Sequence, residues 1–230
     1  LVRNATSRSG VTISGWSTNN HSGANTLGGQ GLTTNSNVFI SNLNGVAFSA
    51  ASLVDNLIGG WAVADGSTFA SYSNVFGVVA MGNTYGGYVS PAFDGDLTST
   101  LTNTKNIGDS ADRSLSGAVA LNSLRYASGT NARTITLSAG STLTLDVGFI
   151  ANSSATTTFA ATNSGNTISG TAQDLYFYVN GSTVVIEPAL VGASSIVANG
   201  GATLSLRPKY ANNTYSGGTF ANAGTLNLQG

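Results

Sequence analysis

The chain has 230 residues, of which 41% are hydrophobic and only 7% are charged, with 30 glycines, no cysteine and a formal net charge of −1. The scattered basic residues form no stripe for phosphate contacts, which argues against nucleic-acid binding, and without cysteine there are neither disulfides nor thiolate metal sites. Helix-forming Lys, Glu, Gln and Arg are scarce, while Thr, Val, Ile and aromatic residues favour strands, so composition predicts an all-β fold.

The first part of the chain contains strand-like segments at irregular spacing. The stretches VTISGWS from Val11 and NVFISNLNGVAFSAASL from Asn37 predict strands, and a further strand pair is expected near Leu121 to Tyr126. Between them, residues 82–112 are polar and rich in glycine, which predicts a long loop insertion packed on the side of the fold. No shift in composition marks a second domain, so we expect a single β-solenoid domain over residues 1–230.

From Arg133 onward, short alternating apolar runs return at steps of about 20 residues, which is the range of one rung in a β-solenoid. One apolar series reads Leu145, Ile168, Ile186, Leu206 and Leu228, and a companion series reads Ile135, Phe159, Phe177, Ile196 and Phe220. Stacking such rungs buries their apolar residues in a continuous column and gives each strand hydrogen-bonded neighbours above and below. The spacing predicts a β-solenoid, with an antiparallel β-sandwich as the alternative.

Alternation within these runs predicts which side chains form the core. In the stretch TLSL, Leu204 and Leu206 are expected to point inward and Ser205 outward. Outward Ser, Thr and Asn side chains can form hydrogen-bonded ladders between rungs, in place of surface charge. Glycine pairs such as Gly217-Gly218 are expected at the corners, because glycine tolerates positive φ.

The closing stretch NTYSGGTFANAGTLNLQG is similar to the repeat of bacterial autotransporter-associated β-strand proteins (the passenger-associated transport repeat), whose unit reads N-T-Y-x-G-G-T-x-x-x-x-G-T-L-x-L-G. Phe220 departs from the small or β-branched residue usual in that unit, and Gln229 delays the closing glycine to Gly230. The matching residues are Asn213, Thr214, Tyr215, Gly217, Gly218, Thr219, Gly224, Thr225, Leu226 and Leu228.

A second segment, IGGWAVADGSTFASY from Ile58 to Tyr72, resembles a G-G-W-A-x-V-x-G-x-D-F-A-x-Y stretch of the larger surface proteins in this group. Thr68 stands where that stretch has an acidic residue, so no role for a carboxylate is carried over. The resemblance implies structural roles for the motif residues Trp61, Tyr215, Gly217, Gly218, Gly224, Leu226 and Leu228.

The resemblance also implies a right-handed parallel β-helix that is exported and displayed at or beyond the bacterial cell surface, as a section of a longer passenger. It implies no shared catalysis. Because such units occur in tandem, Gly230 is expected to be a cut or visible limit, and the expected partners are further repeats of the chain or other copies of it. No apolar run is long enough to span a bilayer, so this segment is not expected to cross a membrane.

Parallel β-helices also include enzymes that cleave pectin and other glycans, so carboxylate pairs need testing as general acid and base. The candidates are Asp94 and Asp96 in FDGD, followed by Asp109 and Asp112. Asp and Gly are ordinary loop residues, and turn structure is favoured over a weak Ca²⁺ site or catalysis. We therefore assign no catalytic, cofactor-binding or metal-binding residue. The RPKY stretch at 207–210 predicts a corner between rungs.

The remaining candidates are aromatic residues and the single histidine. His21 is expected to be a solvated turn residue, since the chain has no G-x-S-x-G nucleophile motif. Trp16, Trp61, Tyr85 and Tyr88 could stack on sugar rings if exposed on one face. Trp61, flanked by small residues, is instead expected in the core. Tyr85 and Tyr88, on the expected insertion, are the candidates for contact with a partner or a glycan.

These observations predict a non-enzymatic extracellular module, structural or adhesive, of a bacterial cell-surface or filament protein. Open solenoid ends are strand edges that pair readily, so end-to-end association or continuation into further repeats is expected. A glycan-binding module is the alternative function, and a polysaccharide-cleaving β-helix enzyme is a third.

Overall fold

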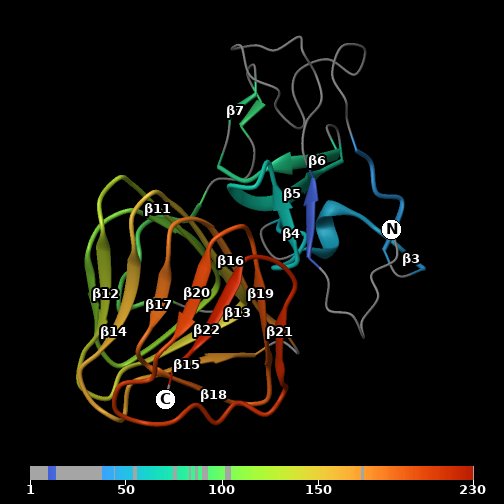
Figure 1. Ribbon diagram of the computed structural model, residues 1–230. Helices are drawn as coiled ribbons and strands as arrows, with labels where there is room; N and C mark the ends of the chain where they lie inside the picture. Colours follow the sequence, from blue (N-terminus) through green and yellow to red (C-terminus); the bar gives the residue numbers. More distant parts are fainter. Residues whose placement is uncertain are drawn as a thin grey trace. The chain divides into compact units, whose positions relative to one another are not determined.

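The chain forms two compact units, residues 1–93 and 94–230, in the computed structural model (Figure 1). Strands make up the regular structure of the described residues, beside one turn of 3-10 helix, η1 (Ala50–Ser52). The sequence predicts one solenoid domain over residues 1–230, whereas the stack of parallel strands lies in the second unit. The structure describes residues 10–13, 38–43, 45–53, 56–74, 77–82, 84–85, 88–89, 93–101, 105–171 and 174–229.

The first unit contains a small mixed sheet in the order β1-β4-β5-β6. In it, β1 pairs parallel with β4, while β5 pairs antiparallel with β4 and with β6. Every residue of β4, β5 and β6 is buried, so these strands form the most buried part of the unit. The strands of the sheet are β1 (Val11–Ile13), β4 (Ala62–Ala64), β5 (Thr68–Ser73) and β6 (Gly77–Ala80). Two hairpins join β2 (Asn42–Leu43) to β3 (Val46–Ala47) and β7 (Thr84–Tyr85) to β8 (Tyr88–Val89).

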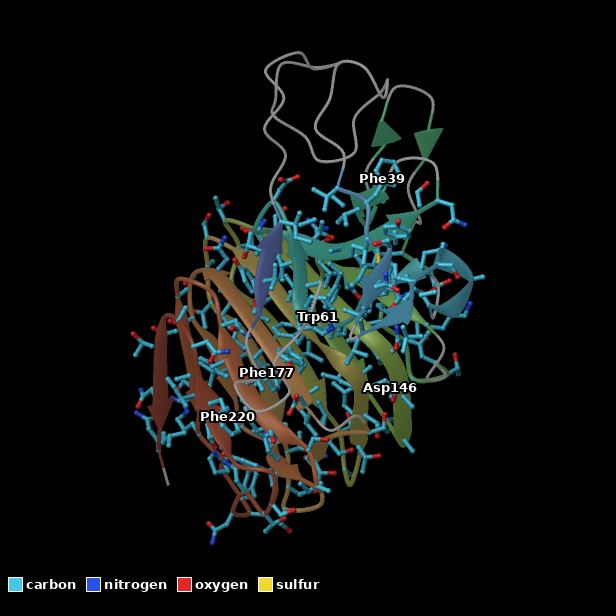
Figure 2. The ribbon with its side chains drawn as sticks, turned by 90° about the vertical axis from the view of Figure 1, so that its right-hand side faces the viewer. Phe39, Trp61, Asp146, Phe177 and Phe220 are labelled. Atoms are coloured by element: carbon cyan, nitrogen blue, oxygen red, sulfur yellow. The ribbon has the colours of Figure 1, made fainter. Side chains whose placement is uncertain are left out.

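Trp61 lies directly before β4, and only 7% of its surface is exposed (Figure 2). Its carbonyl accepts a hydrogen bond of 2.7 Å from the Val11 amide at the start of β1. Gly59 has a φ of +145°, and a Cβ at this position would lie 2.7 Å from the indole Nε1. Glycine at position 59 therefore leaves the space that the Trp61 ring occupies, and the ring takes the core position expected from the sequence.

The second unit is a parallel β-helix with three strand faces. Face 1 is a sheet in the order β10-β12-β14-β17-β20-β22. Every strand pairing described within it is parallel. Its strands are β10 (Arg113–Leu115), β12 (Arg133–Leu137), β14 (Thr157–Ala161), β17 (Val184–Ile186), β20 (Thr203–Leu206) and β22 (Thr225–Leu228).

Faces 2 and 3 share one sheet because β11 (Ala118–Gly129) and β13 (Thr142–Ser153) run through both. The first halves of β11 and β13 form face 2, stacked on β15 (Thr167–Gly170) and β18 (Ala189–Val191). Their second halves form face 3, stacked with β9 (Asn106–Asp109), β16 (Asp174–Gly181), β19 (Ser195–Asn199) and β21 (Thr219–Ala221). A register shift between Leu121 and Ser123 divides the two halves of β11.

These pairings confirm the predicted parallel β-helix and exclude the antiparallel sandwich for the second unit. Leu206 and Leu228 are direct partners on face 1, one rung apart. The sequence interval between partners varies from 17 residues between Asn106 and Ser123 to 28 residues between Phe149 and Phe177. Rungs of unequal length therefore stack in register, because the extra residues are placed between the strands.

The two apolar series derived from spacing alone cross from one face to another. Ile135 and Phe159 are partners on face 1, but the next partner of Phe159 is Ile186 rather than Phe177. Phe177 belongs to face 3, where its partner is Phe149. Each rung contributes apolar strands to several faces at similar intervals, so spacing alone links residues of different faces.

Apolar side chains fill the interior of the β-helix continuously. Phe149 makes an edge-to-face contact with Phe159 at 5.1 Å between ring centroids and a tilted contact with Phe177 at 6.2 Å. All three rings are fully buried, and Figure 2 shows Phe177 within the stack. Burial of each such ring contributes about 1.5–3 kcal/mol to folding.

Polar contacts also join successive rungs, as the sequence predicts. The Thr144 and Ser169 hydroxyls lie 3.2 Å apart on face 2. At the end of face 3, the side-chain amide of Asn222 donates a hydrogen bond of 3.0 Å to the side-chain oxygen of Asn199. Ser205 departs from the prediction, since it is buried rather than exposed. Alternation thus predicts the direction of a side chain but not whether other residues cover it.

Residues 82–112 do not all lie outside the stack. The hairpin of β7 and β8 belongs to the first unit, but β9 pairs in parallel with the second half of β11 and so forms part of face 3. The interval expected as one insertion therefore contains the first strand of the β-helix. The sequence of β9, NIGD, contains a single apolar residue, Ile107, and this residue is fully buried.

Candidate functional site

A short segment, residues 94–101, covers the N-terminal edge of the β-helix, and we call it the capping segment. The Asp94 amide donates to the Asn106 carbonyl at 2.8 Å, and the Gly108 amide donates to the Gly95 carbonyl at 3.3 Å. The segment therefore pairs with the edge of β9 that faces away from β11. Leu97, within the segment, is 1% exposed and belongs to the central core. Its side chain closes the bottom of the apolar column.

The capping segment continues past β9 to the residue that follows β10 and to the first half of β11. The Ser116 amide, directly after β10, donates to the Ser99 hydroxyl at 3.0 Å. The Ala120 amide of β11 reaches the Leu101 carbonyl at 3.5 Å, and Leu101 packs against the core. At this end of the stack, the capping segment is thus bonded to β9, to the first half of β11 and to the residue between β10 and β11.

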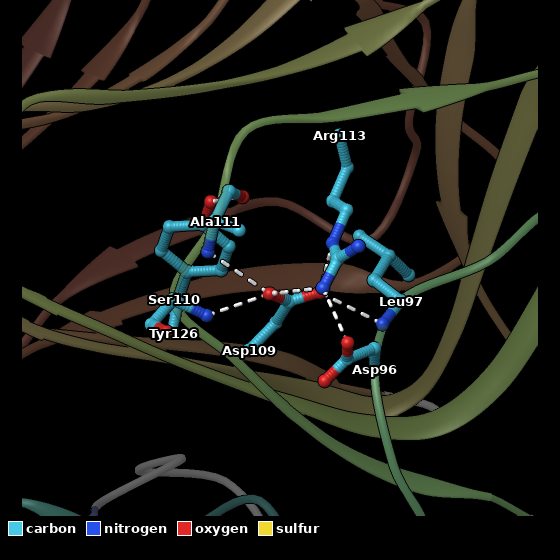
Figure 3. A network of polar contacts seen from close by, with 7 residues as sticks. All are labelled: Asp96, Leu97, Asp109, Ser110, Ala111, Arg113 and Tyr126. Atoms are coloured by element: carbon cyan, nitrogen blue, oxygen red, sulfur yellow. Dashed lines mark hydrogen bonds and ion pairs between the residues drawn. The ribbon is translucent and has the colours of Figure 1, made fainter.

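Asp109, the last residue of β9, is the centre of a polar network at the N-terminal end of the β-helix (Figure 3). Its side chain is 1% exposed. The carboxylate accepts hydrogen bonds from three backbone amides, those of Leu97 at 2.8 Å, Ser110 at 2.6 Å and Ala111 at 3.0 Å. Because Leu97 lies in the capping segment, one carboxylate joins the cap to the first strand.

Arg113 supplies the opposite charge. Its Nε donates to Asp109 at 2.7 Å, and its Nη2 lies 2.6 Å from a carboxylate oxygen of Asp96 in the capping segment. Burial of the Asp109 carboxyl opposes ionisation, but the hydrogen bonds from Arg113 and the backbone amides outweigh it, so the pKa of Asp109 lies below its usual value. Asp109 is therefore ionised at neutral pH.

Tyr126, in the second half of β11, completes the network. Its hydroxyl donates to the Ala111 carbonyl, and its ring is fully buried. Burial, together with the nearby negative charges of Asp109 and Asp112, raises the pKa of Tyr126 to about 12. The phenol thus remains a neutral hydrogen-bond donor at neutral pH and is a poor candidate for a general base.

Two of the predicted carboxylate candidates, Asp96 and Asp109, meet on the guanidinium of Arg113, whereas Asp94 and Asp112 have partners of their own. Asp94 accepts the Asn106 amide at 2.8 Å and pairs with Lys105 at 3.3 Å. Asp112 accepts the Thr134 amide, which, with a smaller contribution from Arg133, lowers its pKa. A general acid needs a raised carboxyl pKa, and Asp109 and Asp112 are shifted the opposite way. Their arrangement therefore fits structural ion pairing.

The opposite end of the β-helix is formed by residues 213–229, which we call the terminal rung. The Thr214 and Ser216 amides donate to the Leu190 and Gly192 carbonyls beside β18, at 2.8 and 2.9 Å. Next come β21 on face 3 and β22 on face 1. The closing stretch of the sequence thus makes one full rung over all three faces.

Two glycines of the terminal rung are required by close approach of the rung beneath. A Cβ at Gly217 would lie 2.4 Å from the Ser195 nitrogen, and one at Gly224 would lie 2.3 Å from the Ala202 carbonyl oxygen. Gly224 also has a φ of +75°, as does Gly218 at +90°. The glycine spacing of the closing motif therefore matches the points where the backbone turns or touches its neighbour.

Other motif residues anchor the terminal rung to the core. The Asn213 side-chain oxygen accepts the Leu190 amide at 2.8 Å, and the Tyr215 hydroxyl bonds to the Thr219 hydroxyl. Tyr215 and Leu226 are partly buried and pack against the core. Leu228, in contrast, is 63% exposed. The terminal rung therefore presents apolar surface that no further rung of the described chain covers.

The tyrosines proposed to contact a partner are only partly described. Tyr85 and Tyr88 are direct backbone partners in the β7–β8 hairpin, and their side chains lie outside what the structure describes. His21 and Trp16 also lie outside the described residues. At the RPKY corner, Arg207 pairs with Glu187 at 3.0 Å after β20, as expected for a turn between rungs.

Sequence reasoning missed Arg113 and Leu97. An Asp and an Arg four positions apart are common on protein surfaces, and a single leucine in a polar stretch gives no periodic signal. Among the residues that the structure describes, no group of three or more His, Asp or Glu side chains could hold a metal ion. None of the described helical residues forms a helix long and apolar enough to cross a membrane.

Comparison of the chain with protein-family models, with curated proteins and with solved structures finds no match. The resemblance of the closing stretch to autotransporter-associated repeats therefore remains a prediction.

Proposed function

We propose that this chain is a non-enzymatic structural or adhesive β-solenoid module of a bacterial cell-surface or filament protein. The observation that carries the proposal is the continuous parallel stack from β9 to β22 around one apolar column. Such a stack gives a stiff body whose length grows by one rung at a time, because each rung contacts only its neighbours. Stiffness and length are the properties that a stalk or a display surface needs.

The ionisable groups of the β-helix support a structural role. Asp109 and Arg113 at the N-terminal end, and Glu187 and Arg207 at a corner, are engaged with one another or with backbone amides. Between these positions, hydroxyl contacts such as Ser128–Ser153 and Thr144–Ser169 join the rungs, and the Thr171 hydroxyl donates to the Asp146 carboxylate. A surface of this kind offers hydrogen bonds to water and to other surfaces without a strong field of either sign.

Surface exposure in the native host tests this proposal. An antibody against the purified chain should label intact cells, and external protease should remove the label without lysis. Labelling that requires lysis would contradict the proposed location. Purified chain incubated with pectin, alginate and chitin fragments should release no product, and release of a product would establish the enzymatic alternative.

The glycan-binding alternative is tested separately. A glycan array probed with the purified chain should give no specific signal if the module is only structural. A reproducible signal that disappears in the Tyr85→Ala/Tyr88→Ala double variant, with unfolding temperature unchanged, would favour the glycan-binding function instead.

A further inference from the structure

We propose that the capping segment opens in acid as a separate unit, while the rungs behind it stay folded. Opening frees the edge of β9 with which the segment pairs, together with the end of the apolar column that Leu97 closes. This opening is independent of the proposed surface role, because it concerns only how one end of the β-helix is held.

The first reason is that carboxylates make the closest side-chain contacts between the capping segment and the first rung (Figure 3). Asp109 of β9 accepts the Leu97 amide of the segment at 2.8 Å. From the segment, Asp96 places a carboxylate oxygen 2.6 Å from Nη2 of Arg113 in β10. Because Arg113 also binds Asp109, one guanidinium joins a carboxylate of the segment to a carboxylate of the rung.

Asp94 makes a further contact of this kind at the start of the segment. Its carboxylate accepts the Asn106 amide at 2.8 Å and pairs with Lys105 at 3.3 Å. The uncharged side-chain contacts come from Ser99, whose hydroxyl lies 3.0 Å and 3.4 Å from the amide and the hydroxyl of Ser116. Hydrogen bonds to an ionised carboxylate are stronger than those between neutral groups, so most of the attachment through side chains requires ionised carboxylates.

The second reason is the charge that acid leaves at this end of the β-helix. At neutral pH the carboxylates balance the cations, but protonation of the carboxylates removes only the negative charges. The Arg113 side chain, which is 27% exposed, is then left without an ionised partner, and such a charge is costly until water reaches it. Among the described residues, the charged or titratable groups around these contacts are Asp94, Asp96, Asp109, Asp112, Lys105, Arg113, Arg133 and Tyr126.

Asp109 gives the pH range in which the segment opens. Burial raises the pKa of Asp109, but the hydrogen bonds from Arg113 and from backbone amides lower it by more, so the folded pKa lies below 3.8. A group with a lowered folded pKa contributes its full stability above the unfolded value and loses it as pH falls through the folded value. The capping segment is therefore closed at neutral pH and opens below pH 3.8.

The third reason is that the rungs behind the first one are held in a different way. From β13 onward, parallel backbone ladders and the buried apolar column join each rung to the next. Neither depends on an ionised carboxylate. Proteins open in cooperative units of unequal stability, so loss of the carboxylate contacts releases the capping segment before it releases the rungs.

Hydrogen exchange of single backbone amides tests the opening, measured by NMR on the 230-residue chain between pH 7 and pH 2 and corrected for the intrinsic effect of pH. The Leu97 and Asn106 amides, which donate to carboxylates, report on the capping segment. The Ser154 and Thr157 amides, which donate to carbonyls of neighbouring rungs, report on the stack. Below pH 3.8, protection of the first two amides should fall about tenfold or more relative to the second two.

A pair of variants separates this contact from a general loss of charge. Asp96→Asn removes one carboxylate of the segment, and that side chain is 65% exposed, so the core is left intact. It should lower the protection of the Leu97 amide at pH 7. The matched control Glu187→Gln removes an ion pair with Arg207 at a corner and should leave that protection unchanged. Simultaneous loss of protection in the segment and the rungs, protection of the segment that does not change with pH, or equal effects of the two variants would each overturn the inference.

Discussion

Arg113 binds Asp109 through two hydrogen bonds, from Nε at 2.7 Å and from Nη2 at 3.1 Å. The same guanidinium also reaches Asp96 in the capping segment. Charge-assisted bidentate contacts are among the stronger polar interactions in proteins. The pair, together with Asp96, therefore links β9 and β10 to the capping segment at the end where the β-helix begins.

Replacement of Asp109 by asparagine should destabilise the second unit on the order of 1–3 kcal/mol, because Arg113 loses its buried partner. In the natural chain the folded pKa of Asp109 lies below the usual value of 3.8. Its contribution is therefore fully present above that value and is lost as pH falls through the folded pKa. Urea unfolding between pH 7 and pH 2 should show this loss in the natural chain and a smaller one in Asp109→Asn. Equal acid sensitivity of the two would contradict the role of Asp109.

Tyr126 should make the stability of the second unit fall at alkaline pH, whereas Asp109 makes it fall at acid pH. Its pKa is raised from the usual value of 10.0 to about 12, so its contribution to stability is complete below pH 10 and is lost as pH rises towards 12. Ultraviolet absorbance should detect one tyrosine that ionises late, and Tyr126→Phe should remove that component. The variant should also lose about 1 kcal/mol of stability at neutral pH through its hydrogen bond to Ala111. If the late component persists in Tyr126→Phe, the assignment is wrong.

A comparison of Gly200→Ala with Gly140→Ala separates the stability lost through backbone strain from that lost through close approach of the neighbouring rung. Both have positive φ, at +97° and +72°, so alanine at either position costs about 1–2 kcal/mol of strain. A Cβ at Gly200 would lie 2.1 Å from the Val179 carbonyl oxygen, whereas nothing lies within 4 Å of one at Gly140. Thermal unfolding should therefore show a clearly larger loss for Gly200→Ala than for Gly140→Ala. Similar losses would mean that the rungs do not approach closely at this corner.

Replacement of Phe177 tests how tightly the apolar column of the β-helix is packed. Its ring is fully buried against Phe149, so Phe177→Ala should cost about 3–5 kcal/mol through lost burial and the cavity that remains. The control is Phe39→Ala, since that ring is 51% exposed and its loss should cost well under 1 kcal/mol. Chemical denaturation followed by circular dichroism compares the two. A small loss for Phe177→Ala would show that the column is not tightly packed.

Much of the β-helix could be predicted from the sequence, because alternation and spacing both reflect stacking. Leu204 and Leu206 point inward as alternation requires, and Leu228 stacks on Leu206 as the spacing requires. The first apolar series passes from face 2 to face 1 between Ile168 and Ile186, because the next partner of Ile168 is Leu190. The companion series passes from face 1 to face 3 beyond Phe159, since a one-dimensional interval does not reveal which of three faces a strand occupies. Ile186, not Phe177, continues that column.

The ends of the stack were harder to predict than its middle. Leu97 is the only apolar residue of the FDGDLTST stretch besides its first phenylalanine, so periodicity could not reveal that it closes the core. Asp109 and Arg113 meet because β9 ends in a turn that returns to β10, a tertiary feature with no local signal. The terminal rung could be predicted because Phe220, Leu226 and Leu228 continue the apolar spacing, and its glycines lie where the backbone turns or touches the rung beneath.

The most direct test of the parallel stack is a nuclear Overhauser effect between the methyl groups of Leu206 and Leu228 in a chain with selectively labelled leucines. These residues are 22 positions apart and direct partners on neighbouring rungs, so a strong cross-peak is expected, and Leu228→Ala should abolish it. Absence of this peak, with cross-peaks instead from hairpin partners that bring β20 and β22 together in antiparallel order, would contradict the β-helix.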